Sequence, residues 1–182
     1  RLTELGVTFT KSELPLRQRI NGIPTCGAHD AVVYQKGPTG LEIKPPALMT
    51  CRLALGFVDV EKLAQELAQK ELGSRVKKLH QGGTYNCRKM ARFDLVSEHS
   101  YGNAIDVRSF TLEDGRSVSV DKHFGPLADP PATASARFLR SLGEQAFDRN
   151  LVSVSLGPYW DALHKDHFHF DMAHYRVDGS RP

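Results

Sequence analysis

The longest run of apolar residues at helical spacing lies in the first half of the chain. Apolar residues between Leu48 and Val58 recur with this spacing, and the pattern continues through Val60–Leu72. The pair Pro45-Pro46 is expected to open the helical region, and Gly73 to end it. Asp59 either caps a second helix or lies within one continuous helix. We expect this region to be scaffold.

Shorter patterns predict strands on both sides of this region. Proline and glycine punctuate the first 40 or so residues, so we expect an irregular segment with short strands at Ala31–Tyr34 and Leu41–Ile43. The later part predicts strands at Val76–Leu79, Asn103–Phe110, Arg116–Val120, Leu151–Leu156 and His167–Met172, a hairpin turn at Glu113–Gly115 and a helix at Thr133–Phe147. The chain contains no internal repeat and no linker. We therefore expect one α+β domain over residues 1–182, with a small, mainly antiparallel sheet and flanking helices.

Composition narrows the class of partner. The 182 residues are 40% hydrophobic and 25% charged, with a formal net charge of +3. This mild basic bias suits an anionic surrounding such as a cell wall but is too weak to indicate nucleic acid. No apolar run approaches the roughly 20 residues that cross a bilayer, so we expect no transmembrane span.

Three cysteines leave the redox state open. Cys26, Cys51 and Cys87 are far apart and form no C-x-x-C pair, which argues against a structural zinc knuckle. In an oxidising compartment two of them could be bridged. We predict the pair Cys51–Cys87, with Cys51 on a helix and Cys87 in a loop that leads to the candidate site. The alternative is three buried free thiols; a catalytic thiol is disfavoured because no histidine neighbours any of them in sequence.

Candidate chemistry is concentrated in the segments 97–106 and 164–171. In the predicted last strand, His167 and His169 point to one face while the intervening phenylalanines point to the core. In the first segment, Asp106 lies on a strand, and Gly102 allows the preceding loop to turn back so that His99 approaches it. Two imidazoles on one face, with a further histidine and a carboxylate, are ligand types that bind zinc.

A simpler interpretation also fits the His-Phe alternation. Such a strand could belong to a half-buried sheet with a polar outer face, in a structural or interaction protein. The occurrence of four ligand-type groups where two strands begin favours the metal site. Ser100 lacks the context of a nucleophile elbow, which disfavours a serine hydrolase. The remaining histidines are interpreted as ordinary structural or surface residues: His29, His80, His123 and His174.

These motifs resemble those of known families. The pattern Ser97-x-His99-x-x-Gly102-x-Ala104-x-Asp106, followed by His167-x-His169, resembles bacterial cell-wall zinc peptidases: D-Ala-D-Ala carboxypeptidases and dipeptidases, lysostaphin-type enzymes (together the LAS group) and the penicillin-insensitive murein endopeptidase. The chain is more closely similar to the bacterial extensin-like C-terminal family, from about Gly6 to Asp171. Further landmarks of that similarity are Met49-Thr50-Cys51, Tyr85-x-Cys87-Arg88, Leu156-Gly157-Pro158 and His164-x-x-His167-Phe168-His169.

The resemblance implies a role for each position. His99, Asp106 and His169 match the zinc ligands, and His167 matches the catalytic base. His164 falls where the murein endopeptidase also has a histidine and would orient water or stabilise the tetrahedral intermediate. Arg88 would bind a substrate carbonyl or carboxylate, although the spacing Tyr85-Asn86-Cys87-Arg88 departs from the usual Tyr-Arg pair.

The implied function is zinc-dependent hydrolysis of peptidoglycan stem peptides or cross-links, by a periplasmic or secreted enzyme whose signal peptide has been removed. An endopeptidase is favoured over a carboxypeptidase. Zn²⁺ would acidify a water molecule and polarise the scissile carbonyl, while a general base takes the proton. The alternative function is a non-catalytic cell-wall binding module that keeps the fold.

Overall fold

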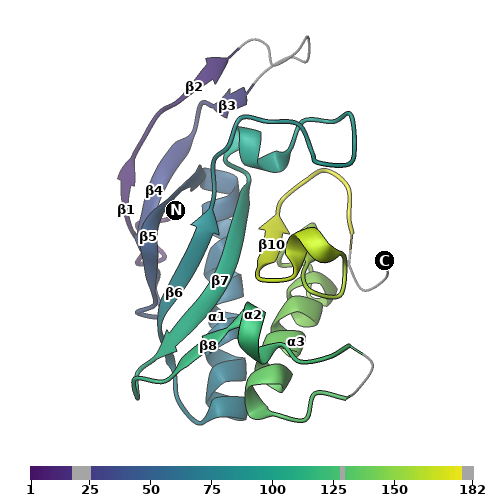
Figure 1. Ribbon diagram of the computed structural model, residues 1–182. Helices are drawn as coiled ribbons and strands as arrows, with labels where there is room; N and C mark the ends of the chain where they lie inside the picture. Colours follow the sequence, from purple (N-terminus) through teal and green to yellow (C-terminus); the bar gives the residue numbers. More distant parts are fainter. Residues whose placement is uncertain (18–25, 128–129, 178–182) are drawn as a thin grey trace.

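The computed structural model describes residues 1–17, 26–127 and 130–177. In this part of the chain a mixed sheet has the strand order β1-β4-β5-β6-β7-β10-β9, with β8 also paired to β7 (Figure 1). All neighbours are antiparallel except β5 and β6. The strands of this sheet are β1 Thr8–Lys11, β4 Ala31–Lys36, β5 Glu42–Thr50, β6 Val76–Gly83, β7 Ala104–Leu112, β8 Ser117–Ser119, β9 Val154–Leu156 and β10 Phe168–Asp171.

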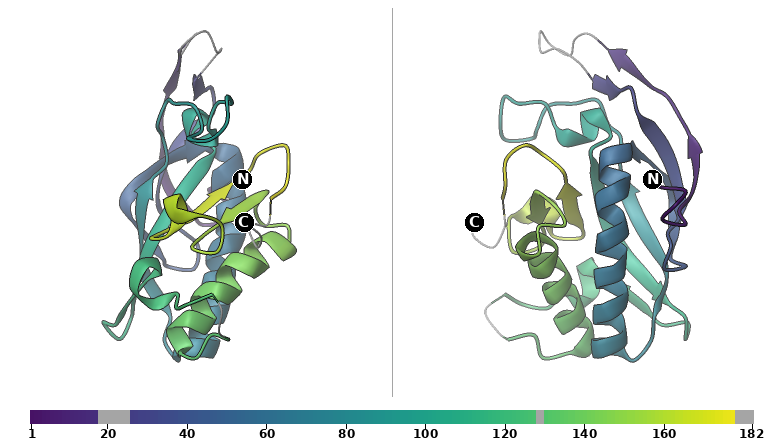
Figure 2. Two further views of the ribbon diagram at one scale, coloured as in Figure 1. Left: turned by 45° about the vertical axis from the view of Figure 1, so that its right-hand side comes forward. Right: turned by 180° about the vertical axis from the view of Figure 1, so that it is seen from behind.

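Two long helices pack on the same face of this sheet, α1 (Cys51–Leu72) and α3 (Ala134–Asp148), as the view from behind in Figure 2 shows. Apolar residues of both helices, such as Leu63, Leu67 and Phe138, are buried there. Aromatic edge contacts join helix and sheet, for example Phe110 to Phe138 with ring centroids 5.1 Å apart. The expected α+β class, with a mostly antiparallel sheet and helices, is confirmed.

Helix α1 begins and ends at specific caps. Thr50 accepts a hydrogen bond from the backbone N–H of Leu53 at 3.1 Å, which satisfies a free donor of the first turn. Gly73 ends the helix in the left-handed conformation, with φ +68°. The helix runs through Asp59 without a break, so the continuous alternative is correct. Because α1 connects the parallel strands β5 and β6, it forms a β-α-β crossover.

The expectation that Pro45-Pro46 opens the helical region is wrong. Strand β5 passes through both prolines and continues to Thr50. Its pairing with β4 is irregular there: Lys36 lies opposite Glu42 and Tyr34 opposite Ala47, so the prolines occupy the interruption. Proline has no N–H to donate to a ladder and is tolerated where pairing is broken.

The N-terminal segment is more regular than the sequence suggests. Besides β1, it contains the antiparallel pair β2 (Leu14–Arg17) and β3 (Cys26–Ala28), which is separate from the main sheet. The remaining elements are the short helix α2 (Val120–His123) and two 3₁₀ turns, η1 (Glu98–Tyr101) and η2 (Ala162–His164). No helix among the described residues is both long and apolar enough to cross a membrane.

Candidate metal centre

The register of two adjacent strands brings the first two ligand candidates together. Asp106 of β7 lies directly opposite His169 of β10, so their side chains project from the same face. The neighbouring residues Phe168 and Phe170 are fully buried on the other face. The strand alternation predicted from the sequence is confirmed, and it fixes the direction of both polar side chains.

The third candidate, His99, comes from the 3₁₀ turn η1. The side chain of Ser97 caps this turn by accepting from the backbone N–H of His99 at 3.4 Å. Gly102 closes it at φ +63°, a conformation that favours glycine. The chain then enters β7, which places His99 beside Asp106, as expected from the turn at Gly102.

Three ligand-type atoms form a nearly equilateral triangle. His99 Nε2 lies 3.1 Å from Asp106 Oδ1 and 3.1 Å from His169 Nδ1, and the third side, His169 Nδ1 to Asp106 Oδ1, is 3.2 Å. The three residues form a possible metal-binding group, and His99 is only 4% exposed. The structure therefore brings together all three ligands predicted from the sequence.

Hydrogen bonds on the far side of each ring orient the lone pairs. His99 Nδ1 lies 3.2 Å from the carbonyl oxygen of Thr84, which can only accept, so Nδ1 carries the proton and Nε2 is left bare in neutral imidazole. His169 Nε2 lies 3.0 Å from Oδ2 of the buried Asp171, so its Nδ1 is likewise bare. When both imidazoles are neutral, their two lone pairs and a carboxylate oxygen therefore converge on one point. Outer partners of this kind are the usual companions of metal-binding histidines.

The same convergence shifts the pKa values. Burial alone would lower the pKa of His169, but its hydrogen bonds with Asp106 and Asp171 raise it to about 9. Burial alone would raise the pKa of Asp106, but the hydrogen bonds with His169 and His99 hold it far below its usual range. Both shifts have one physical cause, since a triangle of acceptors stabilises a positive charge. That charge can be a proton or a metal cation.

The donor set fits zinc. Bonds of roughly 2.0–2.1 Å in a tetrahedral arrangement separate ligand atoms by roughly 3.3 Å, close to the sides of this triangle. Two nitrogens and one oxygen from the protein match a catalytic site, in which a fourth position belongs to water or substrate.

His167, the predicted base, lies beside the triangle. Its Nε2 is 3.7 Å from Asp106 Oδ1, and its Nδ1 lies 2.8 Å from Asp166 Oδ1. The carboxylate accepts from Nδ1, so Nε2 is the nitrogen that faces the candidate metal position.

His164 lies next to His167, with ring centroids 5.3 Å apart. It ends the turn η2, where Asp161 accepts both from its backbone N–H and from Nδ1, the latter at 2.7 Å. Burial lowers the pKa of His164, although the bond to Asp161 opposes the shift. Arg92 approaches the other oxygen of Asp161 at 3.3 Å.

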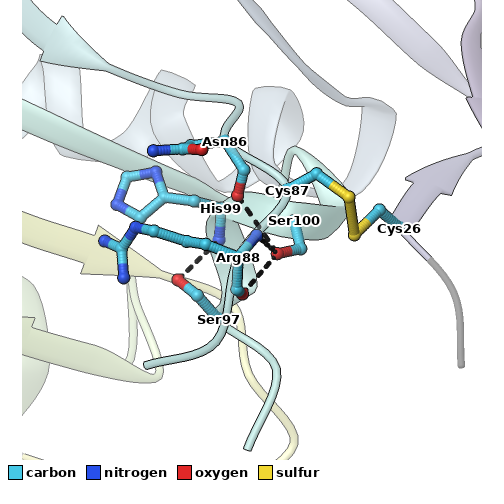
Figure 3. Close-up of a disulfide and its surroundings, with 7 residues drawn as sticks. All are labelled: Cys26, Asn86, Cys87, Arg88, Ser97, His99 and Ser100. Atoms are coloured by element: carbon cyan, nitrogen blue, oxygen red, sulfur yellow. Dashed lines mark hydrogen bonds between the residues drawn. A yellow bond between two sulfur atoms is a disulfide. The ribbon is translucent and has the colours of Figure 1, made fainter. Parts of the chain in front are cut away.

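Arg88 lies in the loop that precedes η1 and lines the same pocket. Its backbone N–H donates to Ser100 Oγ at 2.9 Å, and the Ser100 hydroxyl lies within hydrogen-bond distance of the carbonyl oxygens of Asn86 and Arg88 (Figure 3). Ser100 is thus an anchor for the loop. In the same view the Arg88 side chain and the His99 ring extend to one side of the loop. Among the described residues, no hydrogen bond or ion pair joins the Arg88 guanidinium to His99, Asp106 or His169; it donates instead to the carbonyl oxygen of Lys89.

The predicted disulfide Cys51–Cys87 is wrong. Cys87 is bonded to Cys26, with Cα atoms 5.6 Å apart, and Cys51 is a free thiol (Figure 3). Cys51 does begin a helix and Cys87 does lie in the loop before the site, as expected. The pairing differs because strand β3, which the sequence analysis left as irregular chain, carries Cys26 to the Cys87 loop. The disulfide tethers that loop one residue before Arg88.

A pocket of about 600 Å³ contains these groups. All six predicted site residues line it: Arg88, His99, Asp106, His164, His167 and His169. Its walls include exposed apolar side chains, among them Phe93, which is 60% exposed, and Leu163, which is 51% exposed. This volume is within the usual range for pockets that bind small molecules.

Sequence analysis did not identify the carboxylates that hold the histidines. Asp161, Asp166 and Asp171 each bond one ring, as described above. Their closeness in sequence to histidines was the available signal: three residues before His164, one before His167 and two after His169. His29, His80, His123 and His174 lie outside the ligand triangle, and His80 instead pairs with Thr111 on the sheet.

Comparison with known protein families gives a match over nearly the whole chain. The sequence model of a family described as "Extensin-like protein C-terminus" matches residues 2–181. No curated protein and no solved structure matches the chain.

Proposed function

The chain belongs to the extensin-like protein C-terminus family, and we propose that it is a zinc-dependent peptidase that hydrolyses amide bonds in peptidoglycan stem peptides or cross-links. The observation that carries the proposal is the triangle of His99 Nε2, Asp106 Oδ1 and His169 Nδ1 in the lining of a pocket. The hydrogen bonds that the imidazole N–H groups donate to the Thr84 carbonyl oxygen and the Asp171 carboxylate aim the opposite lone pairs at one point.

Zn²⁺ held by these residues would supply Lewis acidity, which polarises the scissile carbonyl and lowers the pKa of a water molecule from about 15.7 to about 7. His167 is the proposed general base. Its Nε2 faces the ligand triangle, while its other nitrogen is held by Asp166, so the bare nitrogen can take the proton of the attacking water. The same nitrogen can then return the proton to the leaving amine.

His164 is proposed to orient water. Its Nδ1 donates to Asp161, and burial lowers its pKa, so neutral His164 offers only an acceptor at Nε2. Stabilising a tetrahedral oxyanion needs a donor, whereas an acceptor can hold the O–H of a water molecule. Of the two roles that the resemblance suggests, the geometry therefore favours orientation of water.

Substrate binding is proposed to involve Arg88. The cations Lys89 and Arg92 on the same wall are paired with Asp94 and Asp161, whereas the guanidinium of Arg88 donates to the carbonyl oxygen of Lys89. No carboxylate within the described ranges forms an ion pair with Arg88. Its remaining N–H groups can bind a carbonyl or carboxylate of the peptide. Stem peptides as the substrate, an endopeptidase rather than a carboxypeptidase, and a periplasmic or secreted location are taken from the motif resemblance to LAS peptidases.

The test is cleavage of purified muropeptides by metal-free protein, by protein reloaded with zinc, and by His167→Ala. We expect cleavage only after zinc is added, and a large loss of turnover but not of zinc in the variant. Product masses identify the bond. If the zinc-loaded wild-type protein binds muropeptides without cleaving them, the peptidase proposal is refuted and the non-catalytic binding module is favoured.

A further inference from the structure

A chain of polar contacts leads outward from His167. His167 Nδ1 lies 2.8 Å from Asp166 Oδ1, and the second oxygen of this carboxylate, Oδ2, accepts from Arg108 at 3.1 Å. Each oxygen of Asp166 thus has a different partner. Arg108 belongs to β7, two residues after the ligand candidate Asp106, so the same strand presents both residues.

Gly82 leaves the space that Arg108 occupies. A Cβ atom at position 82 would lie 2.5 Å from Nε of Arg108, closer than real Cβ contacts come. Strand β6 pairs with β7 around this position, since Gln81 lies opposite Val107 and Gly83 opposite Asp106. The absence of a side chain at Gly82 therefore lets the Arg108 side chain lie over β6.

The exposed fraction of the side chain increases from His167 through Asp166 to Arg108. The side chain of His167 is 14% exposed, that of Asp166 31% and that of Arg108 55%. An ion pair this exposed contributes little to the stability of a fold. Its geometric effect is larger, because one bond to Nδ1 selects which ring nitrogen carries the proton in neutral imidazole.

We propose that Asp166 and Arg108 are positioning residues for the base: Asp166 fixes His167 with Nδ1–H pointing outward and bare Nε2 facing the pocket, and Arg108 holds the Asp166 carboxylate in place. This inference rests on the proposed function for the role of His167. The hydrogen-bond chain itself consists only of contacts within the protein.

A double-mutant cycle on the zinc-loaded protein tests whether Arg108 acts on His167 through Asp166. Asp166→Asn is expected to lower kcat roughly 10–100-fold, the usual effect of losing such an outer partner, with KM and zinc content unchanged. Arg108→Gln is expected to lower kcat by roughly tenfold or less, and Gly82→Ala to reproduce this loss by displacing the guanidinium. The double variant Asp166→Asn/Arg108→Gln should be no slower than Asp166→Asn, because Arg108 acts only through Asp166.

The matched control is Arg116→Gln, which breaks another exposed arginine–aspartate pair, that with Asp114, and should leave kcat unchanged. Arg108→Lys should restore part of the activity lost in Arg108→Gln. Losses that multiply in the double variant, or wild-type kcat in Asp166→Asn, would overturn the proposal.

A second readout does not depend on activity. Nitrogen NMR of the zinc-loaded protein should show His167 in the Nδ1–H tautomer, and Asp166→Asn should show a mixture of both tautomers. If the wild-type protein cleaves no muropeptide, the proposed function fails while the tautomer result still decides the positioning role. If the protein is active and the tautomer does not respond to Asp166→Asn, the positioning role alone is refuted.

Discussion

The buried residue Glu61 allows a test of how burial shifts a carboxyl pKa in this fold and so makes stability depend on pH. Its carboxyl group lies in the core beneath the 37–40 turn and is 1% exposed. The hydroxyl of Tyr34 donates to Oε1 at 2.7 Å and that of Thr39 to Oε2 at 3.2 Å. Burial outweighs these two hydrogen bonds and a third from the backbone of Thr39, and it raises the pKa of Glu61 from 4.5 to about 7.

Because the pKa of Glu61 is raised in the folded state, the stability that it contributes falls as the pH rises. A carboxyl group with a raised pKa binds its proton more tightly in the folded than in the unfolded state. Its contribution to stability is therefore complete below pH 4.5 and is lost as the pH rises through about 7. The difference between 4.5 and about 7 corresponds to at most about 3 kcal/mol, at about 1.36 kcal/mol per pH unit.

Glu61→Gln should remove this loss of stability at high pH. The amide oxygen can still accept from Tyr34, and the amide N–H can donate to the hydroxyl oxygen of Thr39. Urea unfolding of wild type and variant at about pH 4 and about pH 8.5 measures the effect. Between these conditions the variant should gain up to about 3 kcal/mol relative to wild type. Other titrating groups, including those of the candidate metal centre, cancel in this comparison.

Glu66→Gln is the control, because Glu66 is exposed on the same helix and Arg149 lowers its pKa. Relative to wild type, Glu66→Gln should gain no stability as the pH rises. If the difference between Glu61→Gln and wild type is independent of pH, or becomes less favourable at high pH, the reasoning is refuted.

Three further predictions concern the site and its support. Asp106→Ala should abolish zinc retention, as measured by elemental analysis, and full zinc occupancy in this variant would exclude Asp106 as a ligand. His167→Ala should keep its zinc but lose roughly 10²–10⁴-fold in turnover, as measured by single-substrate kinetics. Asp171→Asn should weaken zinc binding roughly 10–100-fold by releasing His169, measured by competition with a chelator, and unchanged affinity would mean that Asp171 does not orient the ring. Thiol titration of the denatured protein should find one thiol without reductant and three with it, and Cys26→Ser/Cys87→Ser should cost up to about 4 kcal/mol of stability; three thiols without reductant would contradict the disulfide.

Local patterns could predict that His99, Asp106 and His169 lie near one another, whereas the choice of these three as ligands, with His167 as the base, came from the family resemblance. Alternation in Phe168–Asp171 requires the phenylalanines and histidines to take opposite faces, and a fully buried Phe168 and Phe170 leave His169 no other direction. Gly102 marks a turn that a left-handed φ makes possible. These signals lie within a few residues of each ligand.

The features that were missed or mistaken depend on contacts between distant segments. Nothing near Pro45-Pro46 indicates that neighbouring strands extend β5 past them, since this depends on pairing with β4 and β6. The choice of Cys26 over Cys51 as the partner of Cys87 depends on where the β2–β3 pair packs. Likewise, aspartates are common in sequence, and only the folded chain shows that Asp161 and Asp166 each hold a ring.

Equilibrium titration of the metal-free protein with zinc tests the central claim most directly. Wild type is compared with His169→Ala and with His80→Ala, whose imidazole pairs with Thr111 away from the triangle. The account predicts one tightly bound zinc per chain in wild type and in His80→Ala, and none in His169→Ala. A wild-type protein that binds no zinc, or a His169→Ala variant that binds it as tightly as wild type, would contradict the account.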